Sequence, residues 1–231
     1  MTVFSDRLLL QPAPVEPRAL AGDYAFYDDG WRCRLSLRSG PGGELQARFI
    51  SYDRTEGEFP ATVSLRPGPA LGVRIAVADF NELDEQLFTG YAFGRSGIGL
   101  AGKSEWKGQP FGFFARRHPP YSLGPLLPGP VRPADFTGRF DLYCDGAHAT
   151  LELTGTEGGT VRGIVREDGG AELPVTVRVS RSIPYEALIT IHGPEPEPTL
   201  SVWMFSRQRC SLTGWLDWDR VRLGCYLTRC A

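Results

Sequence analysis

The amino-acid sequence predicts an all-β protein built as two tandem eight-stranded antiparallel up-and-down barrels. Three observations lead to this fold class. Apolar and polar residues alternate with a period of two along most segments, turn residues separate the segments, and the second half of the chain repeats the first. With 42% hydrophobic and 23% charged residues over 231 positions, the chain has the composition of an ordinary globular protein.

The period of two is clear in "CRLSLR" at residues 33–38. It puts Cys33, Leu35 and Leu37 on one face and Arg34 and Arg38 on the other, as in a half-buried strand. No segment shows a helical stripe long enough to predict a helix. Closing eight short strands into a barrel removes the exposed sheet edges. The eight expected strands of the first half lie in "GDYAFYD", "CRLSLR", "ELQARFI", "ATVSLR", "GVRIAVA", "LFTGYAFGR", "GIGLAGKSEW" and "QPFGFFARR".

The repeat becomes visible when "AGDYAFYDDG" at residues 21–30 is set beside "TGRFDLYCDG" at residues 137–146. The match continues co-linearly to the end of the chain, with small gaps in polar segments, which is what a duplicated unit produces. The corresponding pairs include Gly22 and Gly138, Tyr27 and Tyr143, Asp29 and Asp145, Phe93 and Phe205, Arg95 and Arg207, Trp106 and Trp218, Gly112 and Gly224, and Arg117 and Arg229.

The segment "HPPYSLGPLLPGPVRP" separates the two copies and contains six prolines, which do not fit a central strand or a helix interior. We therefore expect a first barrel at residues 18–117, a proline-rich linker at residues 118–133 and a second barrel at residues 134–231.

Several function classes are disfavoured by composition. A formal net charge of −2 supplies no basic field for nucleic acid, and the N-terminal segment has neither a secretory signal nor a membrane span. Five cysteines without paired metal spacing suggest reduced thiols in a cytoplasmic protein. No catalytic motif, metal site or cofactor site is recognisable, so we predict no cofactor and no metal and name no catalytic residue.

The first strands of both copies, "GDYAFYDDGWRCRLSLRSGPGGELQARF" and "GRFDLYCDGAHATLELTGTEGGTVRGIV", resemble the opening of avidin- and streptavidin-type barrels, and "LFTGYAFG" is similar to a later strand of that family. This resemblance to small calycin-type barrels implies a barrel with a ligand mouth at one end. It does not imply biotin, because that family holds its ligand with inward polar side chains and several tryptophans, whereas the inward faces here are nearly all aliphatic or aromatic.

A ligand cavity is expected in the first copy, because Gly90 and Ala92 stand where the second copy has Val202 and Met204. The arginines near the strand ends are interpreted first as caps over a barrel end and alternatively as an anion-binding pair. The predicted ligand-binding residues are Tyr24, Asp28, Gly90, Ala92, Arg95 and Arg117.

Two strands are apolar on both faces, so something must cover their outer sides. Their outward residues, Tyr91 and Phe93 in the first copy and Trp203 and Phe205 in the second, are the predicted interface residues. Three arrangements would cover these outer faces: packing of the two barrels on each other, a homo-oligomer or a protein partner.

Two hypotheses for the function follow. The first is a non-enzymatic binding protein for a small apolar ligand or a protein partner, since small eight-stranded barrels can hold one ligand. The alternative is a cofactor-independent cyclase or isomerase acting on a lipophilic metabolite. An inward polar group such as Asp28 or Tyr24, deep in an apolar cavity, would favour the enzyme.

Overall fold

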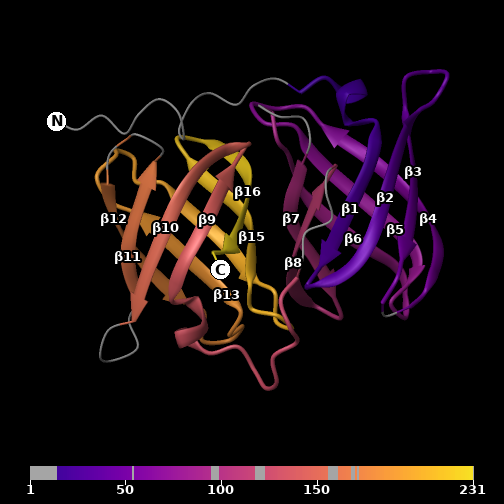
Figure 1. The fold of residues 1–231 in the computed structure, drawn as a ribbon. Coiled ribbons are helices and arrows are strands. Elements are labelled where there is room, and N and C mark those ends of the chain that lie inside the picture. Colours follow the sequence, from indigo (N-terminus) through magenta and orange to yellow (C-terminus); the bar gives the residue numbers. More distant parts are fainter. Residues whose placement is uncertain are drawn as a thin grey trace.

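Two closed antiparallel barrels lie side by side and account for nearly all of the protein (Figure 1), which confirms the predicted fold class. The structure is a computed structural model that describes residues 15–53, 55–94, 99–117, 123–155, 161–167, 170 and 172–230.

In each barrel the strands follow one another in chain order, and the first strand pairs with the last. The first barrel consists of β1 (Gly22–Asp28), β2 (Trp31–Ser39), β3 (Leu45–Ser51), β4 (Gly57–Arg66), β5 (Gly72–Phe80), β6 (Leu83–Ala92), β7 (Gly99–Trp106) and β8 (Gln109–Arg116). The second consists of β9 (Gly138–Cys144), β10 (Ala147–Gly155), β11 (Val161–Glu167), β12 (Glu172–Val179), β13 (Glu186–Ile191), β14 (Thr199–Met204), β15 (Ser211–Trp218) and β16 (Val221–Arg229).

A short 3-10 helix covers one end of the first barrel. This helix, η1 (Pro17–Leu20), precedes β1, and the Tyr24 hydroxyl donates a hydrogen bond to the Leu20 carbonyl at 2.8 Å. The Arg117 guanidinium lies 5.4 Å from the centre of the Tyr24 ring and donates to the Ala21 carbonyl at 2.8 Å. The arginine therefore holds the helix against the barrel end.

The second barrel repeats this cap with η2 (Pro133–Phe136). Arg229 lies 4.7 Å from the centre of the Phe140 ring and donates at 2.6 Å to the Thr137 and Asp135 carbonyls. Each helix has only four residues, too few to show a helical stripe, so the sequence did not predict them.

The two cores differ in chemistry. Phe26 is fully buried at the centre of the first core, and its ring centroid lies 5.1 to 5.2 Å from those of Phe49, Phe88 and Phe113. The second core is mainly aliphatic, with buried residues such as Leu151, Val165, Val175, Ile189, Leu200 and Leu227.

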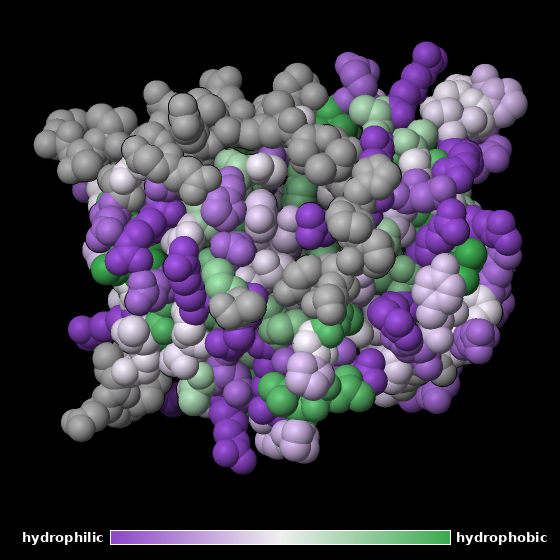
Figure 2. Space-filling model, in the orientation of Figure 1, coloured by the Kyte–Doolittle hydropathy of each residue, from purple (hydrophilic) through white to green (hydrophobic). Residues whose placement is uncertain are grey.

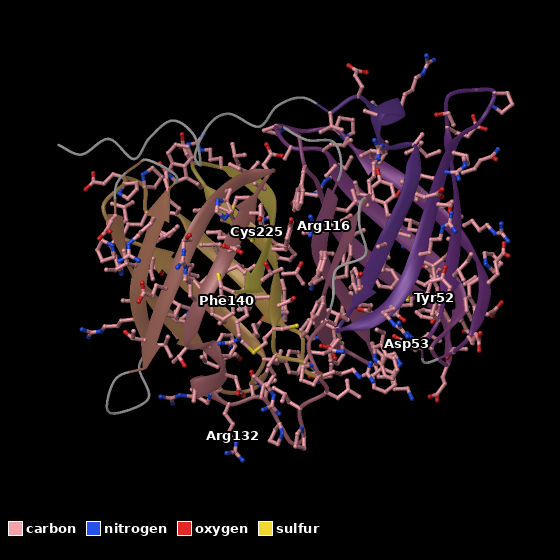
Figure 3. The ribbon with its side chains drawn as sticks, in the orientation of Figure 1. Tyr52, Asp53, Arg116, Arg132, Phe140 and Cys225 are labelled. Atoms are coloured by element: carbon pink, nitrogen blue, oxygen red, sulfur yellow. The ribbon has the colours of Figure 1, made fainter. Side chains whose placement is uncertain are left out.

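The barrels pack together through β6, β7 and β8 of the first and β14, β15 and β16 of the second. At the centre of this seam the Phe114 and Tyr226 rings stack with centroids 5.2 Å apart. Phe114 also stacks on Phe205, and Tyr226 stacks on Phe93. Figure 3 shows Arg116 at the same seam, where it lies 5.7 Å from the centre of the Tyr226 ring.

The seam has approximate two-fold symmetry, because corresponding residues exchange roles across it. A Cβ added at Gly112 would lie 2.9 Å from the Trp203 carbonyl oxygen, and one added at Gly224 would lie 2.9 Å from that of Tyr91. In Figure 1 η1 lies at the top of the first barrel and η2 at the bottom of the second, as expected for a half-turn between them. The contact therefore resembles the isologous interface of a homodimer.

Candidate functional site

The inner face of the β3–β4 hairpin is the least covered part of the first core. On β4 the inward residues Phe59, Ala61, Val63 and Leu65 are half-buried, and their outward neighbours are exposed. Leu45 and Ala47, the inward residues at the start of β3, are half-buried too. These six apolar side chains line the hairpin from one end of the barrel to the other.

The corresponding strands of the second barrel are better covered. Val175 and Val177 of β12 are buried, as is Val161 of β11. Ala61 of the first copy corresponds to Val175, so the first copy carries the smaller side chain at the middle of the strand. The two copies share one fold but differ in how completely the inward residues of these strands are buried.

A buried polar cluster lies near the other end of the first barrel, around Asp28. Ser104 donates to one carboxylate oxygen of Asp28 at 2.6 Å, and Gln86 donates to the other at 3.1 Å. The Asn81 amide donates to the Gln86 side-chain oxygen at 2.6 Å. The Trp106 indole, at the β7–β8 turn, donates to the Asn81 carbonyl at 3.0 Å. Because both carboxylate oxygens accept hydrogen bonds from buried partners, the arrangement suits a structural role.

Cys33 points into the same barrel from β2. Burial, followed by the nearby charge of Asp28, raises the pKa of the Cys33 thiol well above its ordinary value. The thiol therefore stays protonated at neutral pH and is a poor nucleophile.

The predicted ligand-binding residues fall into separate places. Tyr24 and Arg117 come together at the capped end, where the Arg117 guanidinium donates to the Tyr24 hydroxyl at 3.3 Å. They also line a hollow of about 590 Å³ with outward residues of β1 and β2. Ala92 is buried in the packed core, and Arg95 lies outside the described residues.

Gly90 lies at an inward position of β6, as expected, but the expectation that its missing side chain leaves empty space in the barrel is wrong. A Cβ at Gly90 would lie 2.2 Å from the Ala101 carbonyl oxygen and 3.1 Å from the Cα atom of its partner Gly102. The second copy uses Gly214 in the same way, since a Cβ there would lie 2.0 Å from the Ser201 carbonyl oxygen. The missing side chain allows two strands to approach, and it opens no cavity.

The four predicted interface residues lie at the seam between the barrels. Trp203 is 4% exposed and lies over Gly112 of β8, and Tyr91 occupies the corresponding place over Gly224. Phe93 and Phe205 join the ring stack around Phe114 and Tyr226. Within this chain, the other barrel covers the outer sides of the two-sided strands.

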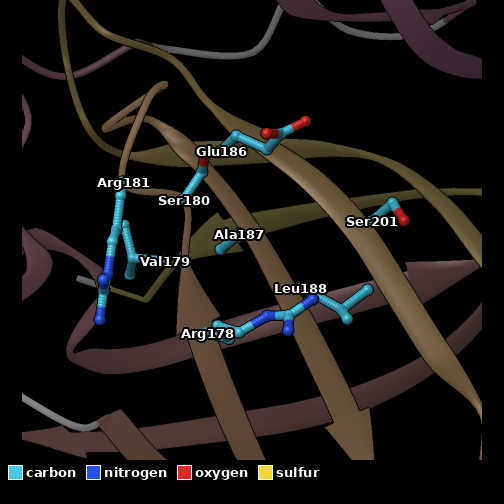
Figure 4. Close-up of a pocket in the computed structure, with 8 residues that line it drawn as sticks. All are labelled: Arg178, Val179, Ser180, Arg181, Glu186, Ala187, Leu188 and Ser201. Carbon is cyan, nitrogen blue, oxygen red and sulfur yellow. The ribbon is translucent and has the colours of Figure 1, made fainter.

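A further hollow of about 620 Å³ lies over β12, β13 and β14 (Figure 4). Figure 4 shows the side chains of Arg178, Arg181 and Glu186 pointing in different directions around it. Since the two guanidinium groups do not converge, the hollow is not arranged to hold one anion.

Among the described residues, no group of three or more His, Cys, Asp or Glu side chains could hold a metal ion. In the same part of the chain, no helix has the length and apolarity needed to span a membrane.

Neither the family models nor the curated proteins include a match to this chain. Two solved structures are similar over most of their length. One is a protein of unknown function of the DUF3598 family from Nostoc punctiforme PCC 73102, with 10% identity, 94% of this chain and 100% of that chain covered, and a TM-score of 0.30. The other, from Bacteroides fragilis NCTC 9343, is described as a "putative outer membrane protein", with 8% identity, coverage of 93% and 99%, and a TM-score of 0.26. Likenesses at this level carry no functional conclusion, so the function has to be argued from the residues of this chain.

Proposed function

We propose that the protein is a non-enzymatic binding protein for a small apolar ligand, which lies against the inner face of β3 and β4 in the first barrel. The observation that carries this proposal is the contrast between β4, whose inward residues are half-buried, and β12, whose corresponding residues are mostly buried. Covering apolar surface is favourable by about 25 cal/mol per Å², so an apolar ligand would gain free energy there. The likeness to avidin-type barrels belongs to this proposal, since it too implies a ligand inside a barrel.

The proposal is tested with N-phenylnaphthylamine, an uncharged probe that fluoresces when it enters an apolar site. Ala61→Phe places a ring on the half-buried inner face of β4, and Thr62→Phe places the same ring on the exposed outer face of the same strand. We expect saturable binding to the wild type and the Thr62 variant, and about tenfold weaker binding to the Ala61 variant. Equal affinities for the two variants, in proteins with unchanged far-UV circular dichroism, would contradict the proposed site.

A protein partner is the second candidate, favoured by the exposed apolar side chains of the segment between the barrels. Leu126 is 61% exposed and Leu127 is 42% exposed. Figure 2 shows apolar surface gathered at the bottom of the molecule, where this segment runs in Figure 1. A contact surface there would lose affinity in a Leu126→Ser, Leu127→Ser variant that still binds N-phenylnaphthylamine.

A further inference from the structure

A groove of about 700 Å³ lies where the β1–β2 turn, the segment between the barrels and the second barrel meet. It is separate from the inner face of β4 and opens on the outside of both barrels. Figure 3 shows Tyr52 and Asp53 at this end of the first barrel. The side chains that define the groove include Trp31, Arg32, Asp53, Leu126, Arg207 and Gln208.

Arg207 and Trp31 form the central contact of the groove. The guanidinium carbon of Arg207 lies 3.4 Å from the centre of the Trp31 ring, which is close stacking between the two planar groups. A stacked guanidinium keeps the N–H donors on its edge available for an anion. Stacking also fixes the position of the positive charge. The Arg207 side chain therefore loses little further conformational freedom when a ligand binds.

The charges in the groove leave Arg207 as the cation available to a ligand. Arg32 is paired with Asp53, with an Nη2 to Oδ1 distance of 2.7 Å and two further contacts from Nε at 3.1 Å. The Arg207 guanidinium stacks on Trp31, and its charge also acts on the carboxylates of Asp29 and Asp53, which accept their hydrogen bonds from Ser206 and Arg32.

Gln208 adds a second polar group beside Arg207. The residue is 7% exposed, and its side-chain amide nitrogen donates to the Gly30 carbonyl at 3.2 Å. Its side-chain oxygen is buried and has no hydrogen-bond partner in the described structure. An unpartnered buried acceptor costs free energy that a ligand N–H or O–H group would recover.

The duplication supports a specific role for this groove, because its central aromatic residue is found in one copy only. Trp31 begins β2, and the corresponding first residue of β10 is Ala147. Arg32 likewise corresponds to His148. Arg207 itself corresponds to Arg95, so the copies differ in the aromatic residue at the groove and not in the arginine. The shared fold therefore does not require a tryptophan at this position, and in the first copy Trp31 stacks on Arg207 at the groove.

We propose that this groove is a second binding site, which takes a small apolar molecule carrying one anionic group and a neighbouring hydrogen-bond donor. Arg207 holds the anionic group, Gln208 accepts the hydrogen bond, and Trp31 with Leu126 covers the apolar body.

Two probes with the same ring skeleton test the proposal on the whole protein. Anilinonaphthalene sulfonate carries an anionic sulfonate beside its N–H group, and N-phenylnaphthylamine lacks the sulfonate. In the wild type we expect the sulfonate probe to bind one groove per chain. Arg207→Gln should weaken its binding about tenfold, because a charge-assisted contact is lost, and should leave the affinity for the uncharged probe unchanged.

Arg222 provides the control, since it lies 4.8 Å from the centre of the Trp215 ring outside the groove, where its charge is paired with Asp217 at 2.6 Å. Arg222→Gln should leave both affinities unchanged, and Trp31→Ala should weaken only the sulfonate probe. The proposal is overturned if Arg207→Gln and Arg222→Gln bind the sulfonate probe equally well. It is also overturned if Ala61→Phe, and not Arg207→Gln, abolishes binding of that probe. Failure of the β4 proposal would instead appear with the uncharged probe, so the two are distinguishable.

Discussion

The Asp29 carboxylate of the first barrel accepts two hydrogen bonds from Ser206 of the second barrel. The Ser206 amide donates to one oxygen and its hydroxyl to the other, both at 2.5 Å. The repeat produces a related contact across the seam, where the Gly94 amide donates to the Asp145 carboxylate. The turn of each barrel's first hairpin therefore contacts the other barrel, and Asp29 holds Ser206, the residue before Arg207.

Asp29 should make the stability of the protein depend on pH. Burial is the main cause that raises its pKa to about 7, with a smaller contribution from the charge of Asp28, and the bonds from Ser206 oppose the rise. Because the ordinary pKa is 3.8, the folded state holds more protons than the unfolded state between about pH 4 and pH 7. The free energy of unfolding should fall by up to roughly 4 kcal/mol as pH rises through this window, and the effect should level off above it.

Urea unfolding of the wild type and Asp29→Asn at several pH values measures this effect. The asparagine variant cannot titrate, so the difference in stability between the two proteins should change between pH 4 and pH 7. Asp23, whose pKa is lowered to about 2 mainly by the Ser36 hydroxyl, contributes its own pH dependence only in more acidic solution. A difference that stays constant from pH 4 to pH 8 would contradict the role assigned to Asp29.

Gly90→Ala should destabilise the first barrel by about 2 to 4 kcal/mol, because the new Cβ would press on the Ala101 carbonyl oxygen and force β6 and β7 apart. Gly155→Ala is the control, since its Cβ would meet the Thr137 methyl group at 3.4 Å, an ordinary contact distance. Chemical denaturation should show a large loss for the first variant and a change within about 0.5 kcal/mol for the second. Equal stabilities would mean that Gly90 lines open space after all.

A fragment of residues 1–120 should form β structure and pair with itself. Its seam residues, among them Tyr91, Phe93 and Phe114, would lose the cover of the second barrel, and a face that packs with two-fold symmetry is suited to a second copy of itself. Sedimentation velocity should show a dimer or larger species. A soluble monomer with a cooperative thermal transition would contradict this prediction and leave the two-barrel architecture intact.

The fold could be predicted from the sequence because its main features are local or repeated. Alternation such as Cys33, Leu35, Leu37 identifies a strand, and two copies of the same strand series limit the choice of topology. Asp29-Gly30 and Asp145-Gly146 likewise mark hairpin turns, where all four residues have positive φ.

The candidate sites could not be predicted in the same way, because they depend on distances between segments. Trp31, Leu126 and Arg207 form one groove although they lie far apart in the chain, and no spacing rule connects them. The prediction for Gly90 was wrong for the same reason. The period of two shows that its position faces the barrel interior, but it does not give the distance to the neighbouring strand β7. The half-buried state of β4 depends on how the rest of the barrel packs against the strand, which residue identity alone does not fix.

The position of a bound apolar probe tests the central claim most directly. With the methyl groups of the protein labelled, nuclear Overhauser effects from N-phenylnaphthylamine report which side chains lie within a few ångströms of it. We predict contacts to the methyl groups of Leu45, Val63 and Leu65 on the half-buried inner face of β3 and β4. Contacts confined to the corresponding Val161 and Val177 of the second barrel, or to Leu126 and Leu127 on the surface, would contradict a ligand site in the first barrel.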